Sequence, residues 1–376
     1  MPRSLVSAAS LTLLLMWNCG KESTAVDPVV AVVVTPTIIS LGPKEPRQLV
    51  ATVQLASGDT LQHAAIYWSA DNEAVARVSQ SGVVTATGDG TVQVRATVAG
   101  VSGAAAVVVQ NVLRDVIIYL TGEFGQPDEI SIVSPDGTAR RRLTIDQLGY
   151  ATLAISPNGR RIAFARLVNG AWGLFLMNAD GGAASLLIQR EFAGSPAWSP
   201  DGSQIAFRSD NDSPVGTYSR IFVINVDGTG LHQVPPDSSH SGDDGPAWSP
   251  DGTRIAFTRG GKLQVVNADG TGLTPLPNDE GATSPAWSPD GTRLAYQSQE
   301  GDIFVRNADG SNPVQLTTTT VWETAARWSP DSRRLVFERV IGGTQLFIIN
   351  ADGTGEVRLS TGSLASDEGP SWSPLP

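Results

Sequence analysis

The sequence has almost no cysteine and almost no histidine. Among 376 residues there is one cysteine, Cys19, and there are three histidines, His63, His232 and His240. A disulfide framework needs paired cysteines, and a cysteine-based zinc site needs several thiolates, so both are excluded. Histidine-based catalysis or metal binding would need partners that these scattered positions hardly offer. We therefore expect no metal and no cofactor.

Positive charge is also scarce. The chain has 26 lysines and arginines against 37 aspartates and glutamates, which gives a net charge of −11. Such a surface repels phosphate backbones, so nucleic acid is excluded as a partner, and it argues against polybasic docking to a membrane. No amphipathic helix of useful length is visible. No apolar run outside the N-terminus approaches about 18 residues, so we expect no integral membrane span.

One apolar run, residues 5–17, follows Arg3 near the N-terminus. It is too short to cross a bilayer but fits the apolar region of a signal peptide. Cys19 comes next, followed by a polar stretch, and this order resembles a bacterial lipoprotein signal in which the cysteine carries the lipid. Trp17 and Asn18 leave the alternative of an ordinary secretory peptide that is cut nearby. We expect a signal peptide over 1–19 and a tether over 20–28. The protein would then be exported to the periplasm or cell surface and anchored by lipid to the outer membrane.

Glycine and proline, by contrast, are plentiful, with 39 and 24 residues, and many lie in recurring turn phrases. This predicts many short strands joined by tight turns, and hence an all-β protein. In residues 29–111 we expect an antiparallel sandwich with Trp68, Val53, Val78, Val84 and Val94 in its core. Its predicted strands are 29–34, 48–55, 65–69, 74–78, 83–86, 92–98 and 104–109.

Several phrases of this region resemble the bacterial immunoglobulin-like domain of group 2. They are Val33-Val34-Thr35-Pro36, Tyr67-Trp68-Ser69-Ala70-Asp71, Val75-Ala76-Arg77-Val78, Gly82-Val83-Val84-Thr85-Ala86, and Gly90 with Val94-Arg95-Ala96. Domains of that family usually serve as spacers or adhesion modules and share no catalytic residues. The resemblance therefore implies a spacer.

Residues 112–376 repeat a Ser-Pro phrase at intervals of 43, 50, 39, 41 and 44 residues. That period is typical of a four-stranded propeller blade. In the unit Trp248-Ser249-Pro250-Asp251-Gly252, the last four residues predict a turn between the innermost strand and the second strand. One repeat position holds a large apolar residue that we expect to pack between blades: Ile155, Trp198, Trp248, Trp287, Trp328 and Trp372.

The two ends of this region complement each other. The first unit lacks an innermost strand, with its other strands expected at 116–120, 130–133 and 142–144, and the last phrase, 369–374, is an innermost strand with no blade after it. We expect the C-terminal strand to complete the first blade and to close a six-bladed propeller.

These repeats resemble the WD40-like PD40 repeats of TolB-like propellers, which also occur in prolyl-oligopeptidase-type enzymes. The enzymes need an α/β-hydrolase domain with a Gly-x-Ser-x-Gly phrase, and the chain contains neither. TolB itself has an α/β domain where this chain has its immunoglobulin-like module. The resemblance implies a channel mouth that receives segments of partner proteins.

Every loop that leads into an innermost strand carries an acidic residue, and such loops gather at one mouth of a propeller channel. The acids are Asp146, Glu191, Asp243, Asp244, Asp279, Glu280, Glu323, Asp367 and Glu368. An acidic rim would favour a cation, a basic peptide or an N-terminal amine. The alternative is that they are ordinary solvated acids of an acidic protein.

Other polar positions have simpler interpretations. The Asp-Gly phrases lack the ligand spacing of a calcium loop, so they predict turns and no metal site. Arg254, Arg293 and Arg334 recur after the turn, where we expect weak salt bridges to turn acids. Trp172 and Trp322 fall outside the repeat position and could stack on a sugar or a peptide, although packing is the common role.

Two functions remain open. The first is a monomeric, non-enzymatic envelope protein whose propeller binds a protein segment or an envelope glycan, with membrane contact through its lipid only. The second is a propeller hydrolase or lyase that acts on cell-wall sugars or peptides. Acids in the rim within about 6 Å of one another, together with a bound metal, would favour the enzyme.

Overall fold

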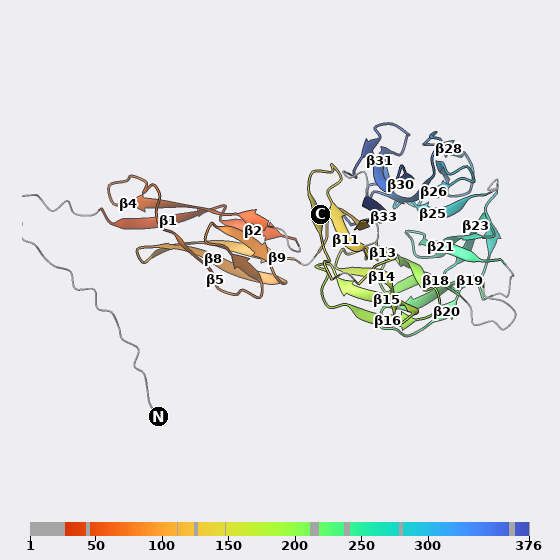
Figure 1. The fold of residues 1–376 in the computed structure, drawn as a ribbon, viewed down its shortest axis with the longest axis horizontal. Coiled ribbons are helices and arrows are strands. Elements are labelled where there is room, and N and C mark those ends of the chain that lie inside the picture. Colours follow the sequence, from red (N-terminus) through yellow and green to blue (C-terminus); the bar gives the residue numbers. More distant parts are fainter. Residues whose placement is uncertain are drawn as a thin grey trace, which may run out of the picture.

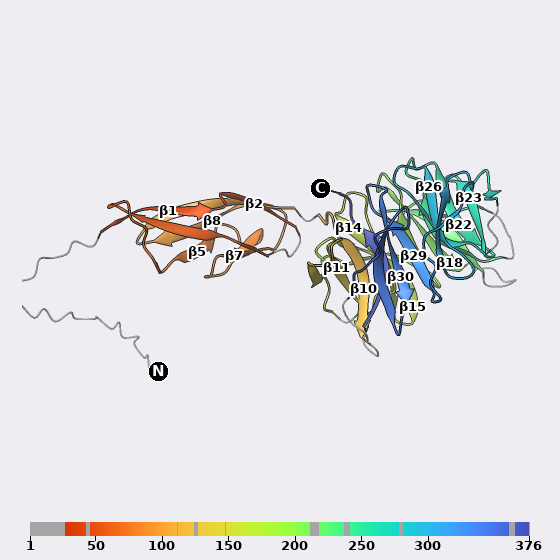
Figure 2. The ribbon, with the colours of Figure 1, turned by 90° about the horizontal axis from the view of Figure 1, so that it is seen from above.

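A computed structural model describes residues 27–42, 46–110, 112–123, 127–146, 148–210, 218–236, 241–277, 281–360 and 365–375. Within these ranges every regular secondary-structure element is a β-strand, as the sequence predicts. The expected signal segment with Cys19, and the acids Asp279 and Glu280, lie outside the described residues. Where the chain is described, it has no helix that is long and apolar enough to cross a membrane. A sandwich and a propeller follow one another along the long axis (Figures 1 and 2).

The sandwich contains three sheets around one core. Trp68, Val53, Val84 and Val94 are buried in it, and Val78 packs against them partly buried, so this predicted core is confirmed. The sheets are β1 (Val29–Thr35) with β4 (Val50–Leu55); β2 (Ile38–Leu41), β9 (Val101–Val109), β8 (Gly90–Val98) and β5 (Tyr67–Ala70); and β3 (Pro46–Gln48), β7 (Val83–Ala86) and β6 (Ala76–Val78).

Strand β2 corrects the expectation of a purely antiparallel sandwich, because it pairs in parallel with β9. After Thr35-Pro36 the chain leaves the sheet of β1 and joins the sheet of β9, β8 and β5. Ile39 and Leu41 then point into the core while Ile38 faces solvent. Four residues carry too little alternation to be recognised as a strand from sequence.

The propeller contains six four-stranded sheets within the described residues, arranged around a centre (Figure 1). From the innermost strand outward, the first blade is β33 (Ala365–Trp372), β10 (Ile117–Glu123), β11 (Glu129–Val133) and β12 (Arg140–Arg142); the second is β13 (Thr152–Ile155), β14 (Arg161–Val168), β15 (Ala171–Asn178) and β16 (Ser185–Gln189); the third is β17 (Gly194–Trp198), β18 (Gln204–Asp210), β19 (Ser219–Asn225) and β20 (His232–Gln233).

The fourth blade is β21 (Asp243–Trp248), β22 (Arg254–Arg259), β23 (Lys262–Asn267) and β24 (Thr274–Pro275); the fifth is β25 (Thr283–Trp287), β26 (Arg293–Gln297), β27 (Ile303–Asn307) and β28 (Val314–Gln315); the sixth is β29 (Glu323–Trp328), β30 (Arg334–Val340), β31 (Thr344–Asn350) and β32 (Val357–Arg358). In the first blade β33 pairs antiparallel with β10, with Trp372 opposite Ile117. The C-terminal strand thus lies where the sequence predicts it. The fourth strand of that blade begins two residues earlier than expected.

Five of the six Ser-Pro phrases form a hydrogen-bonded turn, which we call the Ser-Pro turn; they begin at Ser156, Ser199, Ser249, Ser288 and Ser329. In the fourth blade the Ser249 hydroxyl donates to Oδ1 of Asp251 at 2.5 Å, and its oxygen accepts from the Arg254 N–H at 2.9 Å. The same carboxylate accepts from the amide and hydroxyl of Thr253. These bonds, that from Ser249 first, lower the pKa of Asp251 to about 2. Gly252 takes a φ of +71°, which glycine adopts without strain.

The tryptophans of the repeat position are buried between blades as expected. Three of them donate from Nε1 to a backbone carbonyl of the preceding blade, each at 3.1 Å: Trp198 to Ala154, Trp328 to Ala286, and Trp372 to Arg327.

The recurring arginines do more than the sequence predicts. Arg254 lies 4.8 Å from the ring of Trp287, Arg293 lies 4.5 Å from Trp328, and the same contact recurs at Arg334 with Trp372. Each arginine therefore stacks on the tryptophan of the next blade, a contact worth about 0.5–2 kcal/mol. The expected pairing with a turn acid is present at Arg293, but at a long 3.9 Å from Asp290.

Candidate functional site in the central channel

A cavity of about 760 Å³ runs through the centre of the propeller and is lined by all six innermost strands. At one end its walls include prolines of the Ser-Pro turns, such as Pro157 and Pro330. At the other end lie the loops that lead into the innermost strands and the hairpins between second and third strands. We call this second end the mouth face.

The linker from the sandwich attaches at the end with the Ser-Pro turns. The Leu113 N–H donates to the carbonyl of Gly159 at 2.7 Å, and that of Asp115 donates to the carbonyl of Pro374 at 2.9 Å. Both acceptors belong to Ser-Pro phrases: Gly159 to the turn of the second blade, and Pro374 to the C-terminal phrase. The linker therefore leaves the mouth face free for a ligand.

Five of the six innermost strands carry a bulge where they enter the channel. A residue with positive φ marks each one: Ser195, Gly245, Ser284, Ala325 and Gly369. The pairing register shifts at the same places, whereas β13 pairs regularly. A bulge turns one amide out of the ladder, and here side chains accept from several of these amides. Thr258 Oγ1 accepts from Ser284 at 3.2 Å, and Glu338 Oε1 accepts from Gly369 at 2.5 Å.

Three of the predicted rim acids are buried and do not face a ligand. Oδ1 of Asp243, which is fully buried, accepts from Nε of Arg259 at 2.6 Å, and Oε1 of Glu323 accepts from Nε of Arg339 at the same distance. Asp367 likewise accepts from Ser360 Oγ at 2.7 Å and pairs with an arginine of β12. Their inclusion in an accessible rim is therefore wrong. Successive residues of a strand point to opposite faces of its sheet. In these three strands the face of the first acid is the one packed against a neighbouring sheet.

Two of the predicted acids, Asp244 and Glu368, do line the channel. Asp244 is exposed and lies 3.5 Å from a guanidinium nitrogen of Arg208. Glu368 accepts from the Ser366 hydroxyl at 2.5 Å and stays partly exposed. Asp146 and Glu191 are exposed on the mouth face but outside the cavity lining.

Two channel residues, Arg327 and Glu338, were missed by the sequence reasoning. Arg327 occupies the position before the repeat tryptophan, where the other units have alanine or serine. Glu338 follows the aromatic residue that recurs in the second strand of each blade. At the position of Glu338 the other units have leucine, alanine, arginine, threonine or glutamine. A position-by-position comparison of the repeats, rather than of the loops alone, would have identified both.

Of these two side chains, Glu338 is buried and Arg327 is half-buried. Glu338 is 8% exposed. Burial, reinforced by the negative charge of Glu368, raises its pKa to about 7, although the Gly369 N–H and Arg327 act in the opposite sense. Burial also lowers the pKa of Arg327. Perturbed groups that converge on a cavity are a physical indication of a binding site.

Large apolar side chains are exposed around the same face. They lie in the loops before innermost strands and at the hairpins between second and third strands. They are Ile145, Leu148, Leu167, Phe192, Trp322, Val340 and Ile341. We call this set the apolar rim. The ring of Trp322 packs beside Gly301, where an added Cβ would lie 3.0 Å from it. Trp172, in contrast, packs against the core between the second and third blades.

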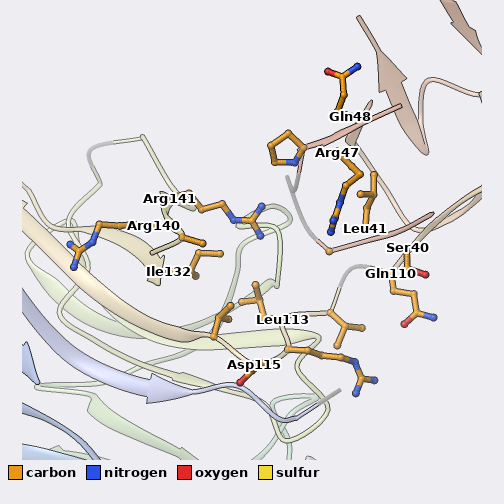
Figure 3. A pocket seen from close by; sticks show the side chains of 16 residues that line it. Ser40, Leu41, Arg47, Gln48, Gln110, Leu113, Asp115, Ile132, Arg140 and Arg141 are labelled. Carbon is orange, nitrogen blue, oxygen red and sulfur yellow. The ribbon is translucent and has the colours of Figure 1, made fainter. Parts of the chain in front are cut away.

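A second cavity, of about 840 Å³, lies between the sandwich and the first blade. Figure 3 shows Arg47 of the sandwich and Arg141 of the propeller reaching towards this space. Arg114, also in the lining, donates to the carbonyl of Leu375 at 2.9 Å. We interpret this cavity as the joint between the two parts. Over the described ranges, no three His, Cys, Asp or Glu side chains group so as to hold a metal ion.

Comparison with known proteins matches both parts of the chain. The sequence model described as the TolB beta propeller domain matches residues 107–375, and that of the bacterial Ig-like domain (group 2) matches residues 28–109. TolB from Acinetobacter baumannii is similar in structure, with a TM-score of 0.61 and 16% identity over 85% of this chain and 84% of that one.

Two further structures share the fold. A putative TolB from Agrobacterium tumefaciens has a TM-score of 0.54 and 18% identity, over 69% of this chain and 95% of that one. A chain of a nidogen/laminin complex has a TM-score of 0.56 and 12% identity, over 68% and 97%.

Proposed function

The chain belongs to the TolB beta propeller family, and from this premise we propose that it binds a segment of a partner protein at the mouth of its channel. It does so as a non-enzymatic protein of the cell envelope. The immunoglobulin-like module at residues 29–111 serves as the spacer, and Cys19 carries the lipid that anchors the exported chain to the outer membrane. The propeller, residues 112–376, is the binding part.

The observation that carries this proposal is the acid-lined cavity. Asp244, Glu338 and Glu368 face about 760 Å³ of space from three different blades. Low-dielectric walls strengthen the field of such charges and favour a positively charged ligand. A basic segment or an amine fits that chemistry.

The apolar rim favours a protein over a glycan as the partner. Exposed apolar side chains around a polar cavity are typical of protein interfaces, in which aromatic anchors contribute most of the affinity. Phe192 and Trp322, both more than half exposed, supply two such aromatic groups. A partner would then contact the rim and place one segment in the channel.

The test is capture of partners from an envelope extract by three forms of the protein. The first is the wild type and the second is Asp244→Asn/Glu368→Gln. The third, Asp146→Asn/Glu191→Gln, removes the same two charges from the same face outside the channel. We expect the second form to lose a partner that the other two retain. Equal recovery by all three forms, or equal loss from both variants, would show that the channel acids do not bind it.

A further inference from the structure

The sixth blade departs from the repeat pattern at two positions that both reach the channel. Arg327 stands where the other innermost strands have a small residue: Ala154, Ala197, Ala247, Ala286 and Ser371. Glu338 stands where the other second strands have Leu120, Ala165, Arg208, Thr258 and Gln297. The scaffold does not need a charge at either of these two positions, since four of the six units have uncharged residues at both.

The fold brings these charges together with Glu368. Arg327 lies opposite Val336 in the pairing of β29 with β30, and Val336 is two residues from Glu338 on the same strand face. Long side chains at such diagonal positions can meet. Glu338 in turn accepts from the Gly369 N–H, and Glu368 is the preceding residue. One guanidinium and two carboxylates therefore share one wall of the cavity.

These charges are only partly satisfied within the chain. Arg327 donates from one guanidinium nitrogen to the carbonyl of Ala326 at 2.9 Å, and no ion pair within 4.0 Å joins it or Glu338 to another described residue. Glu338 nonetheless lies nine-tenths buried and lines the cavity. Charging a buried carboxylate that has no cation within ion-pair distance is costly, so a ligand that places a cation beside Glu338 would offset that cost on binding.

We infer that this wall holds the free amino terminus of a peptide chain. Its ammonium group lies between Glu338 and Glu368, and its first carbonyl oxygen accepts from the Arg327 guanidinium. The inference rests on the proposed function and states which kind of segment enters the channel.

The presence of a guanidinium and two carboxylates in the same lining favours a terminus over a lysine side chain. An α-ammonium lies about 3 Å from the carbonyl oxygen of its own residue. A lysine ammonium stands on a four-carbon stem, roughly 6 Å from its own backbone. Only the terminus offers a cation and an acceptor oxygen to neighbouring carboxylates and a guanidinium at once.

The test compares two probes that differ only at their first nitrogen: trialanine amide and N-acetyl-trialanine amide. Binding is measured by calorimetry and by NMR titration at pH 7.5 with the full chain. We expect saturable binding of the free amine and at least tenfold weaker binding of the acetylated probe. Glu338→Gln and Arg327→Ala, the latter restoring the residue of the other repeats, should each weaken binding of the free amine at least fivefold. Glu191→Gln, on the same face outside the cavity, should leave it unchanged.

Three results would overturn the inference: equal affinity of the two probes, no saturable binding of the free amine, or equally tight binding of N-acetyl-lysine amide. None of them decides the proposed function, which stands or falls on capture of the partner protein. Unchanged circular dichroism and tryptophan fluorescence of Glu338→Gln would establish that a loss of binding does not reflect unfolding.

Discussion

Replacing the buried Glu338 by glutamine should stabilise the propeller at neutral and higher pH. The carboxyl has a pKa of about 7 in the folded chain against 4.5 ordinarily, because burial disfavours its charged form. Between these values the folded state keeps a proton that the unfolded state has released, so the free energy of unfolding falls as pH rises. Below pH 4.5 the group is neutral in both states and contributes nothing.

The size of the effect follows from the same two values. Each pH unit between them costs about 1.4 kcal/mol, so the full loss by pH 8 is roughly 3 kcal/mol. Glutamine keeps an oxygen for the Gly369 N–H and carries no charge. The variant should therefore match the wild type near pH 4.5 and exceed it by roughly 3 kcal/mol at pH 8.

Urea unfolding followed by tryptophan fluorescence, at several values of pH, measures this difference. Glu191→Gln removes an exposed carboxylate and should track the wild type throughout. A stability difference that does not change with pH would refute the reasoning, since the charge would then carry no cost. A variant less stable than the wild type at pH 8 would refute it equally.

Further predictions concern the scaffold and the anchor. Deleting residues 365–376 removes β33 and leaves β10 as an open edge, so the melting temperature should fall by about 10 °C or more, and an unchanged value would contradict ring closure by this strand. Asp243→Ala removes the buried carboxylate that accepts from two guanidinium nitrogens of Arg259 and should cost about 3–5 kcal/mol in urea unfolding, against under about 1 kcal/mol for the exposed Asp244→Ala. Cys19→Ser should move the protein from the membrane fraction to the soluble fraction, and continued sedimentation with membranes would count against lipidation.

The sequence predicts the scaffold well because its contacts recur. Each Ser-Pro turn forms from neighbouring residues, and each tryptophan of the repeat position packs between blades in the same way. A phrase such as Trp248 to Gly252 therefore predicts its own local structure. The arginine stack was missed, because Arg254 meets Trp287 only after two blades have packed. A sequence does not show which ring of the next unit a long side chain will cover.

The site was less predictable, because burial distinguishes residues that look alike in the sequence. Asp243 and Asp244 are neighbours with the same side chain, yet one is fully buried against Arg259 and the other is exposed in the channel. The alternation of a strand and the position of a bulge decide which is which. The departures Arg327 and Glu338, on the other hand, are visible in the sequence once the six units are aligned on their strands.

The central claim, that a partner protein occupies the channel mouth, is tested most directly by photo-cross-linking. A photoreactive phenylalanine derivative at Thr283, in the channel lining, is compared with the same group at Thr274 on the outer strand β24. Illumination in an envelope extract should attach a partner protein at Thr283 and not at Thr274, and Glu338→Gln/Glu368→Gln should abolish the adduct. Adducts that form equally at both positions, or that persist in the double variant, would contradict the account.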